Sequence, residues 1–507
     1  MAGNIMVLGS MSGVGKSLVA AGLCRIFRQD GLSPAPFKSQ NMALNSCITK
    51  EGLEMGRAQV MQAEAAMIEP EAAMNPVLLK PTTDVGSQLI VLGEVKGQMS
   101  AGEYMDYKKK LLPEILAAYA SLSGRFRPMV IEGAGSPAEL NLMENDIVNL
   151  GLAERINADA ILVGDIDRGG VFAQLLGTLM LLPEEGRRRI KGLVINKFRG
   201  DRKIFEPGLK ELEMRCGIPV IGVLPYMNCT LTDEDSLSEK LKYGFCHRGA
   251  SPEETLEIAV IHLPRISNFT DFDVFDCLEG VVLRFVREAS ELGEPDLIIL
   301  PGTKSTIADL KWLREKGFAD RIYKAVKDTP VLGICGGYQM LGRRISDPYG
   351  VEGEKGEEIQ GLGLLPADTV MDKKKTRARV TGRTGKTEGI FSALSGKSFE
   401  GYILHMGETD LIEPEKSLGT LCFQDGKTTR EGILDGNVIG SYVHGILDGF
   451  QFLNALLSSV SRARGKSWKP VNPRNYKDIR EDEYNRLARE MRDAFRMDLV
   501  YEIAGLL

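Results

Sequence analysis

The sequence predicts an α/β protein of two consecutive units, each built around a mostly parallel sheet with helices on both faces. Three observations support this prediction. Short apolar runs alternate with longer helical patterns over residues 4–225 and again over 256–445, and a polar, acidic stretch at 228–254 separates the two series. Such alternation is typical of parallel strands joined by crossover helices. The length of 507 residues exceeds what one hydrophobic core usually covers.

Composition excludes several classes of protein. With 43% apolar and 26% charged residues the chain is expected to fold. A net charge of −6 argues against a nucleic-acid partner. No apolar run approaches the roughly 20 residues of a membrane helix, and the N-terminus lacks the features of a signal peptide. The eight cysteines form no C-x-x-C pair, so we expect a protein of the reducing cytoplasm.

The strands and helices follow from the periodicity. In the first series the apolar runs predict strands at 4–9, 128–133, 159–165, 192–197 and 219–225, with helices including 16–29, 56–68 and 206–215. In the second series the predicted strands are 256–264, 296–302, 329–335 and 437–445. Residues 343–390 are rich in Gly, Lys and Glu and are expected to form exposed hairpins and loops.

These patterns predict four parts of the chain. We expect a first domain at 1–230, a linker at 231–253, a second domain at 254–450 and a helical tail at 451–507. A Pro-containing stretch, "WKPVNPRNYKD", interrupts the helical pattern of the tail.

The stretch "GSMSGVGKS" at 9–17 indicates a phosphate site. It follows the first strand and opens a helix, where glycines and exposed N–H groups cradle phosphates. Gly13 and Gly15 would form the loop, Lys16 would reach the β- and γ-phosphates, and the Ser17 hydroxyl would hold Mg²⁺. The usual spacing G-x-x-x-x-G-K-[ST] is exceeded by one residue, so an ordinary Gly-rich turn is the alternative.

Polar residues end the neighbouring predicted strands. Glu132 in "VIEGAGS" is a candidate Mg²⁺ ligand, although it could simply cap the next turn. Asp165 and Arg168 in "LVGDIDRGG" are candidates for substrate binding, and the Asn196 amide could recognise a purine edge. Because the carboxyl ends of parallel strands form the ligand-binding edge of an open α/β sheet, we expect these residues to lie together.

Two polar segments are candidate recognition surfaces for an anionic or amide-bearing ligand. The segment 35–46 contains Lys38, Gln40, Asn41 and Asn45, and the segment 75–88 contains Lys80, Thr82, Thr83, Asp84 and Gln88. Solvated loops are the alternative interpretation.

The stretch "VLGICGGYQMLG" at 331–342 places Cys335 between a predicted strand and a helix. Small neighbours permit a sharp turn that presents a nucleophile, as in G-x-S-x-G elbows, and the helix N-terminus favours a thiolate. The backbone N–H groups of Gly336 and of Gly302 or Thr303 would stabilise an oxyanion. A small buried cysteine is the alternative.

A thiolate nucleophile also needs a general base, and the chain has four histidines. His444 ends the strand "VIGSYVHG" at the expected edge and is the leading candidate. His405 is second. His247 falls in the linker, and His262 lies in a predicted strand and is expected to be structural.

These motifs resemble known families. "GICGGYQMLG", "YVHG" and "LPGTKST" resemble a glutamine amidotransferase domain of the cobyrinate type. The first half resembles dethiobiotin-synthetase-like ATPases, whose phosphate loop has the same extra residue. Together with "FKSQNMALNS", "NPVLLKPTTDVGSQ", "DIDRGGVF" and "INKFRGD", the whole chain resembles the cobyric acid synthase family.

The resemblance implies a P-loop NTPase-like domain followed by a class I-like glutamine amidotransferase domain. It implies ATP with Mg²⁺, L-glutamine and a corrinoid as ligands, without a tightly bound prosthetic group. The implied reaction amidates the b, d, e and g carboxylates of (adenosyl)cobyrinic acid a,c-diamide through acyl phosphates. Cys335 would be the nucleophile and His444 the base. The sequence does not decide the oligomeric state, for which a homodimer is one alternative.

One position departs from the broader amidotransferase pattern, in which a Glu two residues after the His completes a triad. Here that residue is Ile446, so the orienting acid is either absent or comes from elsewhere in the chain. The sequence predicts only a Cys–His dyad, with Glu408 and Asp448 as weak candidates for the acid. A glutaminase without that acid is expected to be slow until its synthetase site is occupied.

Three rival interpretations differ in class or substrate. Switch ATPases of the chromosome-partition kind share the longer phosphate loop, but they carry a signature lysine where this chain has Met11. A cysteine peptidase would not need the ATP half. A cobyrinic acid a,c-diamide synthase would perform the same chemistry on two other carboxylates.

Overall fold

The computed structural model describes residues 3–82, 86–227, 231, 251–470 and 474–507. The chain divides into two compact units. Unit 1 comprises Met1–Ala43, Leu53–Ser236 and Arg480–Leu507, and unit 2 comprises Leu44–Gly52 and Leu237–Ile479. A short stretch of the first half therefore belongs to unit 2, and the end of the predicted tail belongs to unit 1. Most of the predicted linker lies outside the described residues.

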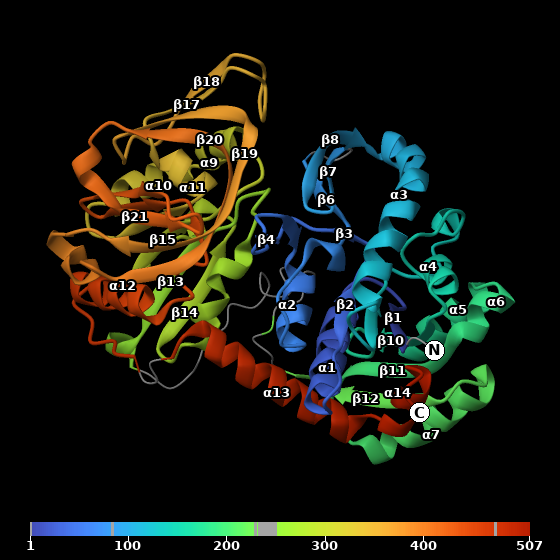
Figure 1. Ribbon diagram of the computed structural model, residues 1–507. Coiled ribbons are helices and arrows are strands. Elements are labelled where there is room, and N and C mark those ends of the chain that lie inside the picture. The colour runs from blue at the N-terminus through green and yellow to red at the C-terminus, as the bar shows by residue number, and fades with distance from the viewer. Residues whose placement is uncertain (1–2, 83–85, 228–230, 232–250, 471–473) are drawn as a thin grey trace. The chain divides into compact units, whose positions relative to one another are not determined.

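Unit 1 is built on a six-stranded sheet in the order β12-β11-β10-β1-β9-β2 (Figure 1). Its paired strands are all parallel, as the first series of apolar runs predicted. The strands are β1 (Asn4–Gly9), β2 (Ala35–Phe37), β9 (Met129–Glu132), β10 (Asp159–Asp165), β11 (Ile190–Phe198) and β12 (Val220–Pro225).

Helices cover both faces of this sheet. On one face, Val7 and Val163 pack with α1 and with the C-terminal helices, which contribute Leu487 and Val500. On the other face, α5 packs so closely that a Cβ on Gly164 would lie 2.8 Å from a Val171 methyl. The helices of unit 1 are α1 (Lys16–Gln29), α2 (Arg57–Ala65), α3 (Ala101–Ser123), α4 (Leu150–Arg155), α5 (Val171–Leu181), α6 (Glu184–Arg189), α7 (Arg202–Cys216) and α14 (Met497–Ile503), joined by the part of α13 (Tyr476–Ala494) from Arg480 on.

The segments predicted as recognition loops contain short strands. The pieces β3 (Gln40–Met42), β6 (Val77–Pro81), β7 (Gly86–Val91) and β8 (Glu94–Ser100) form a second sheet in unit 1. The buried run Val77–Leu79 anchors it. Polar residues such as Gln88 and Gln98 lie directly opposite each other in its ladder, so their polar character masked the strands. Thr83 and Asp84 lie outside the described residues. The remaining short strands of the first half are β4 (Ser46–Ile48) and β5 (Glu54–Gly56).

Unit 2 contains a larger mixed sheet whose parallel part runs β14-β13-β15-β16-β23. Those strands are β13 (Leu256–Ile261), β14 (Val281–Val286), β15 (Leu297–Leu300), β16 (Val331–Ile334) and β23 (Val438–Ser441). The last predicted strand, 437–445, is split, and β24 (Val443–His444) turns to pair with β20. The helices are α9 (Thr306–Glu315), α10 (Phe318–Ala325), α11 (Gly336–Leu341) and α12 (Phe450–Ala463).

Residues 343–390 form more regular structure than the exposed hairpins and loops that were expected. The strands β17 (Arg344–Asp347), β18 (Glu357–Gln360) and β19 (Ala367–Thr384) extend the sheet of unit 2. β19 pairs antiparallel with β20 (Ser398–Leu411) and with β21 (Ser417–Phe423), and β22 (Thr428–Asp435) completes the sheet. Many side chains of β19 are only half-buried, which explains the charged composition.

Within the part of the chain that the structure describes, no helix is both long and apolar enough to cross a bilayer.

Candidate active site

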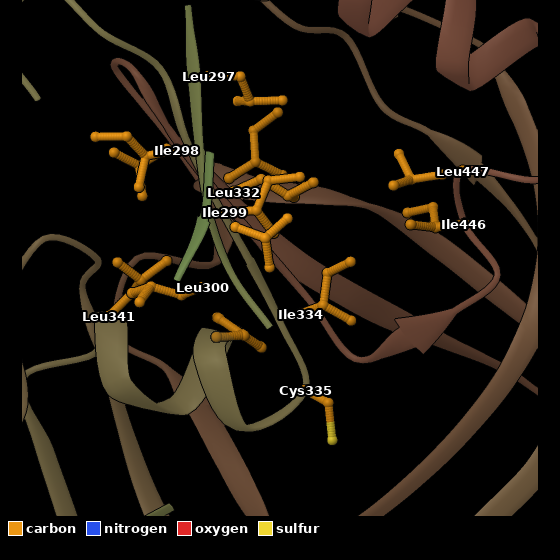
Figure 2. Packing of buried hydrophobic residues seen from close by; sticks show 14 of the residues in the cluster. Leu297, Ile298, Ile299, Leu300, Leu332, Ile334, Cys335, Leu341, Ile446 and Leu447 are labelled. Carbon is orange, nitrogen blue, oxygen red and sulfur yellow. The ribbon is translucent and has the colours of Figure 1, made fainter. Parts of the chain in front are cut away.

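Cys335 lies on a strained turn between β16 and α11. Its φ of 52° and ψ of −109° place it in a region that non-glycine residues rarely occupy. Its N–H donates to the Ser441 carbonyl at 2.8 Å, which fixes the turn to β23. Figure 2 shows the Cys335 sulfur at the edge of an aliphatic cluster, pointing away from the labelled side chains. This is the geometry of a nucleophile elbow.

The glycines after Cys335 permit close packing of the elbow. A Cβ on Gly337 would lie 2.0 Å from the Leu300 carbonyl oxygen, and one on Gly336 would lie 2.7 Å from the Thr303 methyl. Side chains at these positions would therefore push α11 away from β15. The predicted oxyanion donors lie at the same site, because a Cβ on Gly302 would lie 3.1 Å from His444 Cε1.

His444 lies beside the thiol at the end of β24. Cys335 interacts with the His444 ring closely enough to contribute to its raised pKa, and the Cys335 thiol donates to the Leu404 carbonyl at 3.5 Å. On the other side of the ring, Nδ1 lies 2.7 Å from Asp271 Oδ2, and the Gly445 N–H donates to Asp271 Oδ1 at 3.0 Å. All three side chains are buried. The site therefore has the Cys–His–Asp order of a triad.

The electrostatics of His444 follow from this arrangement. Burial opposes a charge on the ring and would lower the pKa of His444. The Asp271 carboxylate, together with Cys335, outweighs burial and raises the pKa of His444 to about 10. An imidazolium beside the thiol is the form that stabilises a cysteine thiolate.

Sequence reasoning missed Asp271. It lies in the 3-10 segment Phe269–Cys277, 173 positions before His444 in the chain. A signal was available: "NFTDFDVF" holds two acids among apolar residues just after β13, and both Asp271 and Asp273 are buried. A buried acid in such a run needs a partner.

The other histidines fit the base role less well. Burial lowers the pKa of His405 to about 4, and its Nδ1 lies 2.9 Å from the Gly407 carbonyl. The neutral ring stacks on Tyr442 at 3.8 Å between centroids. His262 follows the end of β13 instead of lying within a strand, and burial lowers its pKa. His247 lies outside the described residues.

In unit 1 the predicted phosphate loop joins β1 to α1. Gly15 adopts a φ of 93° before the helix begins at Lys16. Two residues at the end of β11 hold the loop: Asn196 Nδ2 donates to the Val14 carbonyl at 2.8 Å, and Lys197 Nζ donates to the Gly13 carbonyl at 3.0 Å. The Asn196 amide thus supports the loop in this structure, and its role toward a purine stays a prediction. Lys197 was not anticipated from the sequence.

Glu132 lies at the centre of a buried polar cluster beside the loop. Its Oε1 accepts hydrogen bonds from Ser17 Oγ and Lys38 Nζ, both at 2.8 Å, and its Oε2 accepts one from Gln62 Nε2 at 2.5 Å. Burial alone would raise the pKa of Glu132, but the Lys38 ammonium, the Gln62 amide and the Lys16 charge hold it below its usual range. The carboxylate is therefore ionised at neutral pH.

The remaining predicted substrate-binding residues have these partners in unit 1. Tyr104 donates to Gln40, and Asn41 Nδ2 donates to Gln59 Oε1 at 3.3 Å. Lys80 Nζ forms a buried ion pair with Glu54 at 3.0 Å. Asp165 lies 3.0 Å from Lys197 Nζ and 3.8 Å from Arg168 Nε. Contact of these residues with substrate stays a prediction.

The chain matches two family models. Residues 5–236 match the CobQ/CobB/MinD/ParA nucleotide binding domain, and residues 257–452 match the CobB/CobQ-like glutamine amidotransferase domain. The first match contains the phosphate loop and the second contains the cysteine elbow.

Curated relatives match the whole length. The cobyric acid synthases of Ruminiclostridium cellulolyticum and Lachnoclostridium phytofermentans are each 51% identical; the matches cover 99% of this chain and 97% and 99% of the relatives, respectively. The cobyric acid synthase of Clostridium tetani is 46% identical, with 99% of both chains covered.

Nucleotide-binding and glutaminase units in one chain define an ATP-using glutamine amidotransferase, a ligase that makes carbon–nitrogen bonds. The full-length relatives then fix the family. The chain belongs to the cobyric acid synthase family and takes part in cobalamin biosynthesis.

Proposed function

We propose that this enzyme amidates the b, d, e and g carboxylates of (adenosyl)cobyrinic acid a,c-diamide to give (adenosyl)cobyric acid, with glutamine as the nitrogen source. The observation that carries the proposal is the Cys335–His444–Asp271 arrangement in a chain that also holds a phosphate loop. A thiol site that releases ammonia and a site that activates carboxylates complete one reaction.

In the glutaminase step, the Cys335 thiolate attacks the side-chain carbonyl carbon of glutamine. The N–H groups near Gly302 and Gly336 stabilise the oxyanion. The His444 imidazolium gives its proton to the leaving ammonia, and the thioester remains on Cys335. His444 then takes a proton from water, which attacks the thioester and releases glutamate. Asp271 keeps the ring oriented through Nδ1 in both steps.

In the synthetase step, a corrinoid carboxylate attacks the γ-phosphorus of ATP, and ADP leaves. Lys16 and the N–H groups of the phosphate loop hold the phosphates. Ammonia attacks the acyl phosphate carbonyl, and inorganic phosphate leaves with the former carboxylate oxygen. The product is the amide.

Ser17 and Glu132 fit a Mg²⁺ ion. Their oxygens lie 2.8 Å apart, and a hydroxyl with an ionised carboxylate is the donor set this metal prefers. Mg²⁺ bound there would neutralise charge on the phosphates, whose oxygens and water would complete the coordination. Among the described residues no group of three His, Cys, Asp or Glu side chains is arranged to hold a metal ion. The cytoplasmic location predicted from the cysteines stays a prediction.

The test uses the Cys335→Ala variant with cobyrinic acid a,c-diamide and ATP. We expect amidation with ammonium salts to continue at the wild-type rate while glutamine-dependent amidation falls to background, because only the thiol step is lost. Equal loss with both nitrogen sources would refute the role of Cys335. Mass spectrometry of the product distinguishes the rival substrate: amides at positions other than b, d, e and g would contradict the proposed specificity.

A further inference from the structure

We propose that the segment Leu44–Gly52 is a positioning element of the glutaminase site, acting through Asn45, Ser46 and Tyr402. The inference rests on the proposed function, because it assigns residues that hold His444 and Asp271 in place. The first observation is the grouping of the chain: Leu44–Gly52 belongs to unit 2, whereas the residues on both sides of it belong to unit 1. A strand is thus supplied to the glutaminase unit from a distant part of the sequence.

The segment binds the residues that lead to Asp271. The Phe269 N–H donates to Asn45 Oδ1 at 3.2 Å, and the Ser46 N–H donates to Asn268 Oδ1 at 3.3 Å. Asn268 has a φ of 53°, and its carbonyl accepts from the Asp271 N–H at 3.0 Å. Asn is one of the few non-glycine residues that adopt this left-handed conformation readily, so it suits a turn that hydrogen bonds hold in place. Two bonds from the segment therefore fix the turn from which the Asp271 carboxylate projects.

The segment also binds the ring that stacks on His444. Tyr402 Oη donates to the Ser46 carbonyl at 2.9 Å and accepts from Asn268 Nδ2 at 3.0 Å. The Tyr402 and His444 rings stack with centroids 5.3 Å apart and an interplanar angle of 23°. The two residues are also direct partners in the β20–β24 ladder. Tyr402 thereby limits the movement of the imidazole out of the plane set by Asp271.

The C-terminal end of β4, at Ile48, is fixed as well. Arg379 Nε, on β19, donates to the Ile48 carbonyl at 2.8 Å. Asn45, Ser46 and Ile48 are buried, so their hydrogen bonds do not compete with water. The segment is anchored at both ends and touches both supports of His444, which a loop present only for packing would not need.

In the sequence, the segment directly follows predicted substrate-binding residues. Lys38, Gln40 and Asn41, which are predicted substrate-binding residues, precede Asn45 within one continuous stretch. The stretch 38–48 therefore carries predicted synthetase side chains and positioning groups for the glutaminase.

The test compares Asn45→Ala and Tyr402→Phe with the wild-type full-length enzyme. Each substitution removes buried hydrogen bonds while the nucleophile and the base remain. We expect kcat for glutamine hydrolysis to fall about fivefold to tenfold in each variant. The KM for glutamine is expected to stay within about twofold, because Asn45 and Tyr402 orient catalytic groups and are not assigned to glutamine binding. Ammonia-dependent amidation is expected to match the wild type.

Thr387→Ala is the matched control, since it also removes buried hydrogen bonds in unit 2, to the Phe391 carbonyl and to Ser395. We expect it to lower the melting temperature and leave glutamine kcat unchanged. The proposal is overturned if Asn45→Ala keeps wild-type glutamine kcat, or if its ammonia-dependent rate falls equally. Cys335→Ala is measured alongside: if that variant still uses glutamine, the proposed function itself fails, whereas a normal Asn45→Ala beside an inactive Cys335→Ala rejects only the positioning role.

Discussion

Asp271 holds His444 by a 2.7 Å contact between Oδ2 and Nδ1, although the two residues are 173 positions apart in the sequence. The same carboxylate also accepts from the Gly445 N–H, so it fixes both the ring and the backbone that carries it. The orienting acid missing from position 446 is therefore supplied by another part of the fold. The sequence left open whether such an acid is absent or comes from elsewhere in the chain, and the structure places Asp271 beside His444.

The Asp271→Asn variant tests this acid. We expect glutaminase kcat to fall by about 100-fold or more, because the amide no longer fixes the ring tautomer or stabilises the imidazolium. Without the Asp271 charge, burial dominates and the pKa of His444 falls from about 10. The active imidazolium form is then lost at lower pH, so the alkaline limb of the kcat profile moves toward neutrality.

The matched control for Asp271 is the exposed Glu408, one of the two acids that the sequence had suggested. Glu408→Gln is expected to keep the wild-type rate and pH profile. An unchanged alkaline limb in Asp271→Asn would contradict the assigned role of Asp271.

Residues that lie next to a strand end in a short motif were predictable from the sequence. Cys335, His444, Lys16 and Glu132 each follow or end an apolar run, and the structure brings them together in two clusters as the strand-edge argument predicted. The strand and helix at 4–9 and 16–29 match β1 and α1.

The parts that were missed depend on contacts between distant segments. Asp271 reaches His444 through the path of a 3-10 segment that has no motif. The assignment of Leu44–Gly52 to unit 2 depends on bonds such as that from Phe269 to Asn45, which no local pattern encodes. The strands at 343–411 were obscured because their charged side chains are half-exposed along a long antiparallel pair.

Gly302→Ala tests how tightly the base is enclosed. The added methyl would lie 3.1 Å from His444 Cε1 and 3.4 Å from the Ser267 carbonyl oxygen. Crowding of this kind costs about 1–3 kcal/mol, so we expect glutamine-dependent kcat to fall by about tenfold or more. Amidation with ammonium salts serves as the control and should be unaffected. A wild-type rate with glutamine would show that His444 tolerates the methyl.

Lys16→Ala and Glu132→Gln test the phosphate site. Both variants are expected to lose amidation with either nitrogen source, because Lys16 is proposed to bind the phosphates and Glu132 is the proposed Mg²⁺ ligand. Their basal glutaminase activity should survive, since the Cys335 site is intact. Titration of activity with Mg²⁺ provides the second readout. Full activity at the wild-type Mg²⁺ requirement in Glu132→Gln would exclude the metal-ligand role.

We expect the stability of the fold to depend on pH through Glu431. Burial raises the pKa of this carboxyl from its ordinary 4.5 to about 7, against the bonds it accepts from Ser441 Oγ and the Tyr442 N–H. Because the folded state keeps the proton better, this stabilising contribution is complete below about pH 4.5 and is lost as the pH rises through 7. The loss is on the order of 3 kcal/mol.

The Glu431→Gln variant should not show this loss. The difference in melting temperature, variant minus wild type, is expected to increase as the pH is raised from about 5 to about 8. Thermal unfolding of both proteins across that range measures the difference. A constant difference would mean that Glu431 does not titrate there.

The last prediction concerns coupling between the two reactions. The absence of a third acid no longer supports a slow free glutaminase, since Asp271 orients His444. A different reason remains: residues 38–48 run without interruption from predicted substrate-binding side chains to the groups that hold Asp271 and Tyr402. Ordering of this stretch by ATP and the corrinoid is expected to align the base and raise glutaminase kcat.

The measurement is glutamate release with and without ATP and cobyrinic acid a,c-diamide. We expect the ligands to accelerate wild-type hydrolysis and to have a smaller effect on Asn45→Ala, in which the stretch has lost its bond to the Phe269 N–H. A wild-type rate that is high and indifferent to both ligands would refute the coupling. Equal acceleration in wild type and variant would instead place the coupling outside this segment, because the altered bond would then transmit nothing.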